Sequence, residues 1–504
     1  MPKSTMTVDI ESTTCSPPKH KRQRMKNNNV DDDDDDMRIN QYQGWTVPES
    51  NYQIPILLST EEDGITPERF YNDYIRHRRP VVIRGKKLPN ELRNLDRWKT
   101  NNNIMTDRAG DESVMVEKRS HDSDSFGKGD EISMNFRTFM KLIEAGDNMH
   151  YLTTQDVMAN ADGRPELMAT FMKKLRGSSD DTEAGTTTVA FPLRPNIAGN
   201  LIPQNINLWI GNSKDGTSSG LHHDYHDNFY IVLRGIKRFR LFSPADTEKM
   251  YTRCPELVKV HRNGRINYKG EVTTAYGADI EAYAAAKAAK AKDDAEERLV
   301  KAEKGVEEGR PGAKEELELA EALLDEAMDA ILDTEMDSNI DEGEEQFHLE
   351  HAKEGDVDAD PGGIDLDIIS SSSDDDDDID INIIDSHGDG CRIVDKTVKN
   401  PNNFSKVEQS ILDNDERLKQ DFPQILEANS AFCECHAGDI LYLPASWFHE
   451  VRSFSDGNSS SSNKSNNNGH MAFNYWFHPP DADDDFEHPY TTEFWPNDFK
   501  NRSA

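Results

Sequence analysis

The chain has 504 residues, of which 35% are hydrophobic and 30% charged, and its formal net charge is -37. The length allows two or three domains, but the low hydrophobic share and the concentration of acidic residues in a few runs indicate one core of about 300 residues with long polar additions. The acid excess argues against a nucleic-acid-binding surface, because phosphates require cationic partners. It is compatible with a basic peptide or protein partner, or simply with solubility.

The sequence has neither an N-terminal apolar run typical of signal peptides nor a stretch of about 18 consecutive apolar residues. Its five cysteines show no regular spacing, which fits a reduced environment inside the cell. Cys433 and Cys435 would share one face of a strand, and because no second pair could complete a zinc site, ordinary burial is expected for both. We therefore expect a protein of the nucleus or cytoplasm that is not secreted and does not enter a membrane.

Residues 1–59 are expected to form a disordered tail. The tail contains the basic cluster PPKHKRQRMK (17–26), followed by six aspartates at 31–36. The cluster is a candidate nuclear import signal, although short basic runs also occur on tails without that role.

The ordered part is expected to begin near residue 60. Thr66 and Pro67 have the residue types of an N-cap and of a first helical position, and aromatic residues follow at helical spacing. A further helix is expected at 134–146, and strands are expected at 81–85, 113–118, 149–155 and 205–211. Short strands separated by turn residues predominate, and this pattern predicts a mainly β barrel or sandwich with flanking helices.

A change of composition divides this domain into two parts, 60–275 and 401–495, with 496–504 as a terminal tail. Residues 276–335 are rich in Ala, Lys, Glu and Leu, and EEGRPG separates them into the two helices of a hairpin. Residues 336–400 are acidic and of low complexity, and are expected to be extended and disordered. Doubling the length of a loop costs only about 0.6 kcal/mol, so a barrel tolerates such an insertion at a surface loop.

Candidate metal ligands concentrate in the run LHHDYH. In a strand alternate residues face the same side, so His222, Asp224 and His226 would share one face and His223 would point to the other, unless a bend before His226 takes it out of the site. A third ligand is offered by His449, at the head of a strand in GDILYLPASWFHEV. Two histidines and one carboxylate form the facial triad of non-haem Fe(II) oxygenases, although zinc accepts the same ligand types.

Lys237 decides between the two metals if it faces inwards. It lies on the strand after the turn at Gly235. A buried ammonium group is costly without an anionic partner, so an inward Lys237 would bind the distal carboxylate of a co-substrate. The alternative is a lysine on the outer, solvated face.

Three runs keep an order that resembles the jumonji-C (JmjC, cupin-like) family: LHHDYHDNFYIVLRGIKRFRLFSPAD, GDILYLPASWFHEV and FNYWFH. The resemblance is closest to the small protein-hydroxylase branch with the jumonji lysyl hydroxylases and the factor inhibiting HIF. It implies a double-stranded β-helix (jelly-roll) core and an Fe(II)- and 2-oxoglutarate-dependent dioxygenase. Such an enzyme uses O2, converts 2-oxoglutarate to succinate and CO2, and takes ascorbate as reductant.

Carried over residue by residue, the resemblance implies that His222, Asp224 and His449 bind iron and that Lys237 grips the distal carboxylate of 2-oxoglutarate. Further contacts to the co-substrate are implied for four residues, namely Ser219, Tyr151, Asn228 and Asn474. Trp209 is expected to form a wall of the pocket, and the remaining two histidines of the run are expected not to bind iron.

The substrate is left open by the resemblance. Hydroxylation of a protein side chain, with lysine favoured, is expected over the demethylation or peptidase activity of related proteins on histone tails, because no finger, Tudor or zinc-binding cluster accompanies the domain. A non-catalytic metal-binding module that acts through the hairpin is a third alternative. The expected partner is a protein or peptide, basic if the acid excess matters, and the sequence leaves homodimerisation open.

Overall fold

The structure of the protein is a computed structural model, and it describes residues 39–503 apart from several gaps. The gaps are 60–64, 120–124, 127–129, 160–163, 178–181, 184–185, 188, 255, 352–400, 456–468 and 483–484. The side chains of 333–351 are not described either. The basic cluster at 17–26, the aspartates at 31–36 and most of the acidic tract therefore lie outside the described residues.

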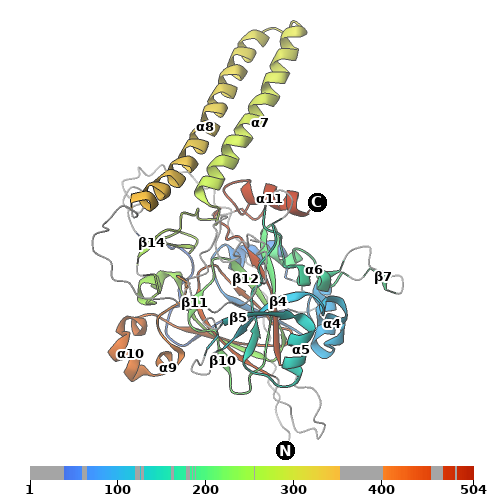
Figure 1. The fold of residues 1–504 in the computed structure, drawn as a ribbon, viewed down its shortest axis with the longest axis vertical. Coiled ribbons are helices and arrows are strands. Elements are labelled where there is room, and N and C mark those ends of the chain that lie inside the picture. The colour runs from blue at the N-terminus through green and yellow to red at the C-terminus, as the bar shows by residue number, and fades with distance from the viewer. Residues whose placement is uncertain are drawn as a thin grey trace, which may run out of the picture. The chain divides into compact units, whose positions relative to one another are not determined.

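Two β-sheets form the core of the described residues (Figure 1). The larger sheet has the strand order β2-β3-β17-β12-β19-β9-β6-β4-β5, and the smaller has β1-β16-β13-β18-β10, with β11 also paired to β18. This arrangement confirms the predicted mainly β, cupin-like double-stranded β-helix with flanking helices. The strands of the larger sheet are β2 (Ile56–Ser59), β3 (Val81–Gly85), β4 (Ser113–Lys118), β5 (Asp130–Asn135), β6 (His150–Leu152), β9 (Pro203–Gly211), β12 (Asp227–Arg234), β17 (Ile440–Leu443) and β19 (His470–Phe477). Those of the smaller sheet are β1 (Tyr52–Gln53), β10 (Thr217–Ser218), β11 (His222–His223), β13 (Ile236–Phe242), β16 (Ala431–His436) and β18 (Phe448–Phe454).

Alternation along the strands fills the space between the sheets. On β12, Tyr230 and Val232 pack with Phe239 and Leu241 of β13 in one core cluster, while Phe229, Ile231 and Leu233 point into a second. Every residue of β12 is buried, as expected of a strand covered on both faces. The turn to β13 requires Gly235, since φ is +75° and an added Cβ would lie 2.2 Å from the carbonyl oxygen of Phe454.

Helices cover the second of these clusters. They are α2 (Pro67–Phe70), a π-helical turn (Tyr71–Ile75), α3 (Asp96–Thr100), α4 (Asn103–Ala109), α5 (Phe136–Glu144), α6 (Thr170–Arg176) and, at the C-terminus, α11 (Phe494–Ser503). Thr66 caps α2 by accepting a hydrogen bond from the Arg69 N–H, as its residue type predicts. The helix expected from residue 134 begins two residues later, because Met134 pairs with Val114 in the sheet. Among the helices described, none combines the length and apolarity needed to cross a bilayer.

The assignment of all of residues 1–59 to a tail is wrong for its last third. β1 pairs in parallel with β16, and β2 pairs in parallel with β3. Trp45 stacks on Trp447, with ring centroids 5.7 Å apart. Part of the order of this segment comes from partners far away in the sequence, since Tyr52 pairs with Ala431 and Trp45 stacks on Trp447, and local composition could not reveal these contacts.

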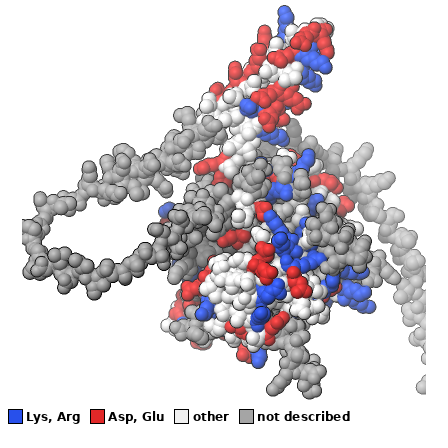
Figure 2. Space-filling model, turned by 45° about the vertical axis from the view of Figure 1, so that its right-hand side comes forward, with Lys and Arg blue, Asp and Glu red and all other residues white. Residues whose placement is uncertain are grey.

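The insertion contains the two expected helices, α7 (Ile280–Glu307) and α8 (Ala313–His351). Alanines at a seven-residue spacing are buried in the hairpin: Ala288, Ala295 and Ala302 on α7, and Ala313, Ala320 and Ala327 on α8. Small side chains at this period let two antiparallel helices approach closely. α8 continues to His351, past the expected boundary at 335. On the face in Figure 2, acidic and basic side chains are interspersed on both the hairpin and the domain.

The chain after the insertion forms short helices that the sequence reading did not anticipate. They are α9 (Gln409–Leu412), α10 (Asp415–Asp421) and a 3-10 turn (Pro423–Glu427). Residues 496–503 of the predicted tail belong to α11, whose Trp495 donates a hydrogen bond of 2.7 Å to the carbonyl oxygen of Tyr276. The remaining elements are short: β7 (Thr182–Glu183), β8 (Thr186–Thr187), β14 (Leu257–Val260), β15 (Ile266–Tyr268), and 3-10 turns at Asn90–Leu95, Asn196–Ala198 and Pro244–Lys249.

Candidate metal and co-substrate site

His222, Asp224 and His449 meet on the inner side of the smaller sheet. His222 and His449 are directly opposite each other on β11 and β18, the closest cross-strand relation that an antiparallel pair offers. The Nε2 atoms of His222 and His449 lie 3.9 and 3.7 Å from the two oxygens of the Asp224 carboxylate. One ligand atom from each residue lies within 4.8 Å of the others, so the three can coordinate a single ion.

Backbone contacts fix which imidazole nitrogen faces the ion. The Nδ1 atom of His222 lies 3.0 Å from the carbonyl oxygen of Gly220, and Nδ1 of His449 lies 2.9 Å from that of Trp447. A carbonyl oxygen only accepts, so both Nδ1 atoms carry the proton and both Nε2 atoms present a lone pair. This second contact of a histidine ligand also holds its ring in orientation.

The expectation of a continuous strand through 222–226 is wrong after His223. β11 ends there, and residues 224–226 form a bend before β12. The bend is held because the Ser446 N–H donates to the carbonyl oxygen of Asp224 (2.7 Å) and because Asp227, fully buried, forms an ion pair with Arg78. Asp224 therefore reaches the site by a turn and not by the alternation of a strand.

Electrostatics favour the ionised form of Asp224. Burial raises the pKa of its carboxyl, but the imidazoles of His449, His222 and His223 outweigh burial, and the pKa is lowered from its ordinary value. A carboxylate that stays ionised is what a divalent cation requires of its ligand.

A cavity of about 120 Å³ opens beside the three residues, room for on the order of ten waters. Its lining includes all three candidate ligands together with Tyr151, Ser219, Asn228 and the expected wall residue Trp209. The sequence reading missed several other lining residues, namely Glu117, Phe126, Thr217, Asn403, Phe404, Ser453, His470 and Trp476. They come from strands and loops far apart in the sequence, and apart from Trp476, which lies in the run FNYWFH, they carry no motif of their own.

Lys237 faces inwards and is fully buried. Its Nζ donates to Ser453 Oγ (2.7 Å), lies 3.2 Å from His470 Nδ1, and sits 5.9 Å from the centre of the Tyr151 ring. Among the described residues it forms no ion pair, and burial lowers its pKa from 10.5 to about 7. Ser453 and His470 line the cavity, so an anion that entered it would meet the ammonium group beside these two side chains.

The hydroxyl groups of Tyr151 and Ser219 differ in their surroundings. The Tyr151 ring stacks on Phe126, with centroids 4.9 Å apart, and passes close to Gly211, where an added Cβ would lie 2.6 Å from the ring. Burial raises the pKa of its hydroxyl, which therefore stays protonated and able to donate. The hydroxyl of Ser219 is already engaged, because it donates to Gly220 O and accepts from Val451 N–H, both at 3.1 Å.

Asn228 and Asn474 form a chain of amides behind the cavity. Trp209 Nε1 donates to Asn474 Oδ1 (2.9 Å), and Asn474 Nδ2 donates to Asn228 Oδ1 (3.0 Å). This order leaves the NH2 group of Asn228, which lines the cavity, as its remaining donor. Asn474 does not line the cavity itself, and its hydrogen bond orients the side chain of Asn228.

The two other histidines of the run point away from the candidate ligands. His223 is buried with Nε2 2.9 Å from the Tyr268 hydroxyl, and burial lowers its pKa to about 3. His226 stacks on Trp476 with ring centroids 5.8 Å apart. Neither is in the group of residues able to share one ion, although both are buried and not solvated.

Comparisons with known proteins agree with this architecture. The cupin-like domain family matches residues 67–483. JmjC domain-containing protein 4 of Schizosaccharomyces pombe is 32% identical over 473 residues, which are 90% of each chain. A shorter match, 41% identical over 49 residues, relates 10% of this chain to 14% of the lysine-specific demethylase JMJ32 of Arabidopsis thaliana.

Proposed function

The chain belongs to the JmjC, or cupin-like, family, and from this premise we propose that it is an Fe(II)- and 2-oxoglutarate-dependent dioxygenase that hydroxylates a protein side chain, with lysine as the favoured target. JmjC proteins are generally 2-oxoglutarate oxygenases. The proposal for this chain rests on one observation: a His-Asp-His group lines a cavity whose lining residues Ser453 and His470 contact the buried Lys237, which has no ion-pair partner among the described residues.

The donor set fits Fe(II). Two imidazoles and one carboxylate on one side of an ion leave adjacent positions open for a bidentate keto acid and for O2. Zinc accepts the same donors, but a zinc hydrolase has no use for a buried ammonium at the far end of the cavity. When bound, iron would activate O2, the oxidant, of which one oxygen atom would enter the C–H bond and the other succinate as 2-oxoglutarate is converted to succinate and CO2.

The protein's own residues would bind and orient the co-substrate. The Lys237 ammonium pairs with the distal carboxylate, while the hydroxyls of Ser453 and Tyr151 supply further donors on the same side. Asn228, oriented by Asn474, offers its NH2 group to the cavity. Apolar walls such as Phe239 and Val451 limit the water around the reacting atoms, which strengthens each of these polar contacts.

A cationic substrate side chain is supported by Glu117. It lines the cavity and is only 6% exposed, and apart from Asp224 it is the one acidic residue in the lining. A carboxylate in such a low-dielectric wall attracts an ammonium group more strongly than a surface carboxylate does. This favours a lysyl side chain, in a protein or basic peptide, over an apolar or acidic one.

Purified protein with Fe(II), 2-oxoglutarate and ascorbate should convert 2-oxoglutarate to succinate, faster when candidate protein substrates are present. His222→Ala should abolish turnover, while His436→Ala, which removes an exposed imidazole paired with Glu434, should leave it unchanged. Full turnover by His222→Ala would refute the assignment of the metal site. Mass spectrometry of the treated substrates then identifies the modified residue.

The second candidate is a lysine demethylase, for which the short match to JMJ32 is the specific support. The same mass spectra separate the two reactions, since hydroxylation adds one oxygen whereas demethylation removes a methyl group. The cluster at 17–26 makes the nucleus, beside the cytoplasm, a proposed location, and imaging of a fluorescent fusion with and without that cluster is the test.

A further inference from the structure

The chain that returns from the insertion lies directly against the candidate metal site. Residues 403–405 run beside β11 and across residues 250–253, with isolated bridges from Phe404 to His222 and from Ser405 to Thr252. Phe404 and Asn403 also line the cavity. None of these residues matched the motifs of the family in the sequence, because they follow a long acidic tract and have no characteristic spacing to the ligands.

Phe404 stacks on the imidazole of His222. The ring centroids are 4.7 Å apart and the planes are inclined by only 10°, so the phenyl ring covers one face of the histidine. The His449 ring, whose centroid is 4.3 Å from that of His222, is tilted by 54°. Between these neighbours the His222 ring has little freedom to turn about its Cβ–Cγ bond.

Asn403 forms two hydrogen bonds with the backbone of β11. Its carbonyl oxygen accepts from the His223 N–H (3.1 Å), and its side-chain Nδ2 donates to the carbonyl oxygen of His223 (2.6 Å). One residue later, the Ser405 N–H donates to the carbonyl oxygen of Leu221 (2.8 Å). β11 contains only two residues, and these bonds supply order that so short a strand lacks.

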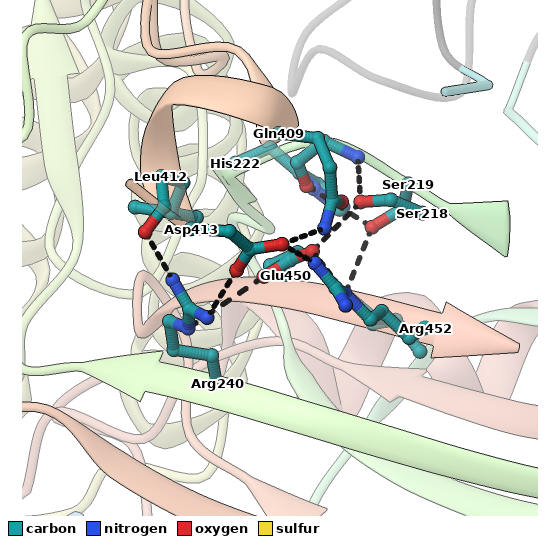
Figure 3. A network of polar contacts seen from close by, with 11 residues as sticks. Ser218, Ser219, His222, Arg240, Gln409, Leu412, Asp413, Glu450 and Arg452 are labelled. Carbon is teal, nitrogen blue, oxygen red and sulfur yellow. Dashed lines mark hydrogen bonds and ion pairs between the residues drawn. The ribbon is translucent and has the colours of Figure 1, made fainter. Parts of the chain in front are cut away.

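A polar network ties the next turns of this segment to the other side of the site (Figure 3). Asp413, just after α9, forms ion pairs with Arg240 of β13 and Arg452 of β18. Arg452 Nε donates to Glu450 (3.0 Å), which is 2% exposed and follows the ligand His449.

The network continues from Glu450 to His222 (Figure 3). Ser218 Oγ donates to Glu450 Oε1 (3.1 Å) and accepts from the Gly220 N–H (3.0 Å). The carbonyl oxygen of Gly220 then accepts from Nδ1 of His222. Hydrogen bonds and ion pairs, connected through the backbone of Gly220, thus join Asp413 to a candidate metal ligand.

We propose that the segment 403–413, which follows the insertion, positions His222 for metal binding, with Phe404 holding the ring by stacking and Asp413 anchoring the network behind it. This inference rests on the proposed function, because it concerns the same metal. Neither residue touches the reacting atoms, so both are positioning residues. The segment that follows the insertion thus helps to hold the candidate metal ligand His222 in place.

The test is metal affinity and not only activity. Apoprotein is titrated with Mn²⁺ and the free ion is followed by electron paramagnetic resonance, for the wild type, Phe404→Ala, Phe404→Leu and Phe404→Tyr. Loss of a residue that orients a ligand weakens binding about 10- to 100-fold. We expect at least tenfold weaker Mn²⁺ binding for the Ala and Leu variants, and affinity within threefold of the wild type for Tyr, which keeps the ring.

A matched control separates positioning from general loss of packing. Phe422→Ala removes another partly buried ring of the same region, which contacts Tyr251 at 5.1 Å and does not line the cavity. It should lower the thermal midpoint without changing Mn²⁺ affinity. Asp413→Ala should weaken Mn²⁺ binding several-fold, whereas Asp421→Ala, an exposed carboxylate on α10, should not.

The outcomes for the inference and for the proposed function are distinct. Failure of the folded wild type to bind Mn²⁺ would overturn the proposed function and this inference together. Wild-type binding with an unchanged affinity in folded Phe404→Leu and Phe404→Ala would overturn the inference alone. A split in the kinetics provides a second readout: the Phe404 variants should require more Fe(II) for half-maximal turnover, while KM for 2-oxoglutarate stays within about twofold.

Discussion

Replacing Lys237 by methionine should stabilise the protein while it abolishes binding of the co-substrate. Burial lowers the pKa of Lys237 from 10.5 to about 7. Each pKa unit corresponds to about 1.4 kcal/mol, so the protonated lysine destabilises the fold at low pH by about 5 kcal/mol. The hydrogen bond to Ser453 is lost in the variant and offsets about 1.5–3 kcal/mol of this gain. Lys237→Met should therefore unfold with a free energy about 2–3.5 kcal/mol higher than the wild type at pH 6.

The difference in the free energy of unfolding between Lys237→Met and the wild type should depend on pH. Between pH 7 and pH 10.5 the unfolded chain keeps its proton on Lys237 while the folded protein loses it, so wild-type stability rises with pH across this window. The advantage of Lys237→Met is complete below pH 7 and shrinks by about 1.4 kcal/mol per pH unit above it. Urea unfolding of both proteins at pH 6, 7, 8 and 9 measures the difference. A variant that is less stable than the wild type at pH 6, or a difference that does not depend on pH, would refute the burial of an uncompensated ammonium group.

Three further predictions concern the same cavity. Because the carboxylate of the co-substrate needs the ammonium form, KM for 2-oxoglutarate should rise about tenfold per pH unit above pH 7, measured by succinate release. Glu117→Gln should raise KM for a lysyl peptide about tenfold and leave the affinity for Mn²⁺ unchanged, and an unaltered peptide KM would exclude Glu117 from substrate binding. Gly211→Ala places a Cβ 2.6 Å from Tyr151 and 2.9 Å from His470, so it should raise KM for 2-oxoglutarate with little change in metal affinity; calorimetric titration of both ligands is the check.

Much of the fold was predictable because its local patterns are strong. The strands at 81–85, 113–118 and 205–211 lie where their β-branched runs indicate, and the hairpin helices separate at EEGRPG as expected. The errors have a common cause. The elements within residues 39–59 and the helices between 409 and 427 are short, and much of their order depends on contacts with strands distant in the sequence. No local periodicity records such contacts.

The residues of the candidate site also fall into those that the sequence predicted and those that it did not. His222, Asp224, His449 and Lys237 were found because they sit in runs of strong β character with a recognisable order. Their neighbours Ser453, His470 and Phe404 were missed, although each touches one of these four or lies against it. A serine, a histidine and a phenylalanine are common residues, and only the folded structure, with Ser453 on β18, His470 on β19 and Phe404 bridged to β11, gives them a place in the site.

The site combines two features that destabilise the protein without its ligands. His222, Asp224 and His449, three groups suited to a cation, converge at one place, and the fully buried ammonium group of Lys237 contacts Ser453 and His470 of the same cavity. Burial of either feature alone would cost free energy, and apolar residues in both places would give a more stable core. A ligand that brings a cation to the first and an anion to the second offsets both costs at once. Iron with 2-oxoglutarate would do so in one assembly, which is why Lys237, and not the three candidate metal ligands, makes the stronger argument for the proposed co-substrate.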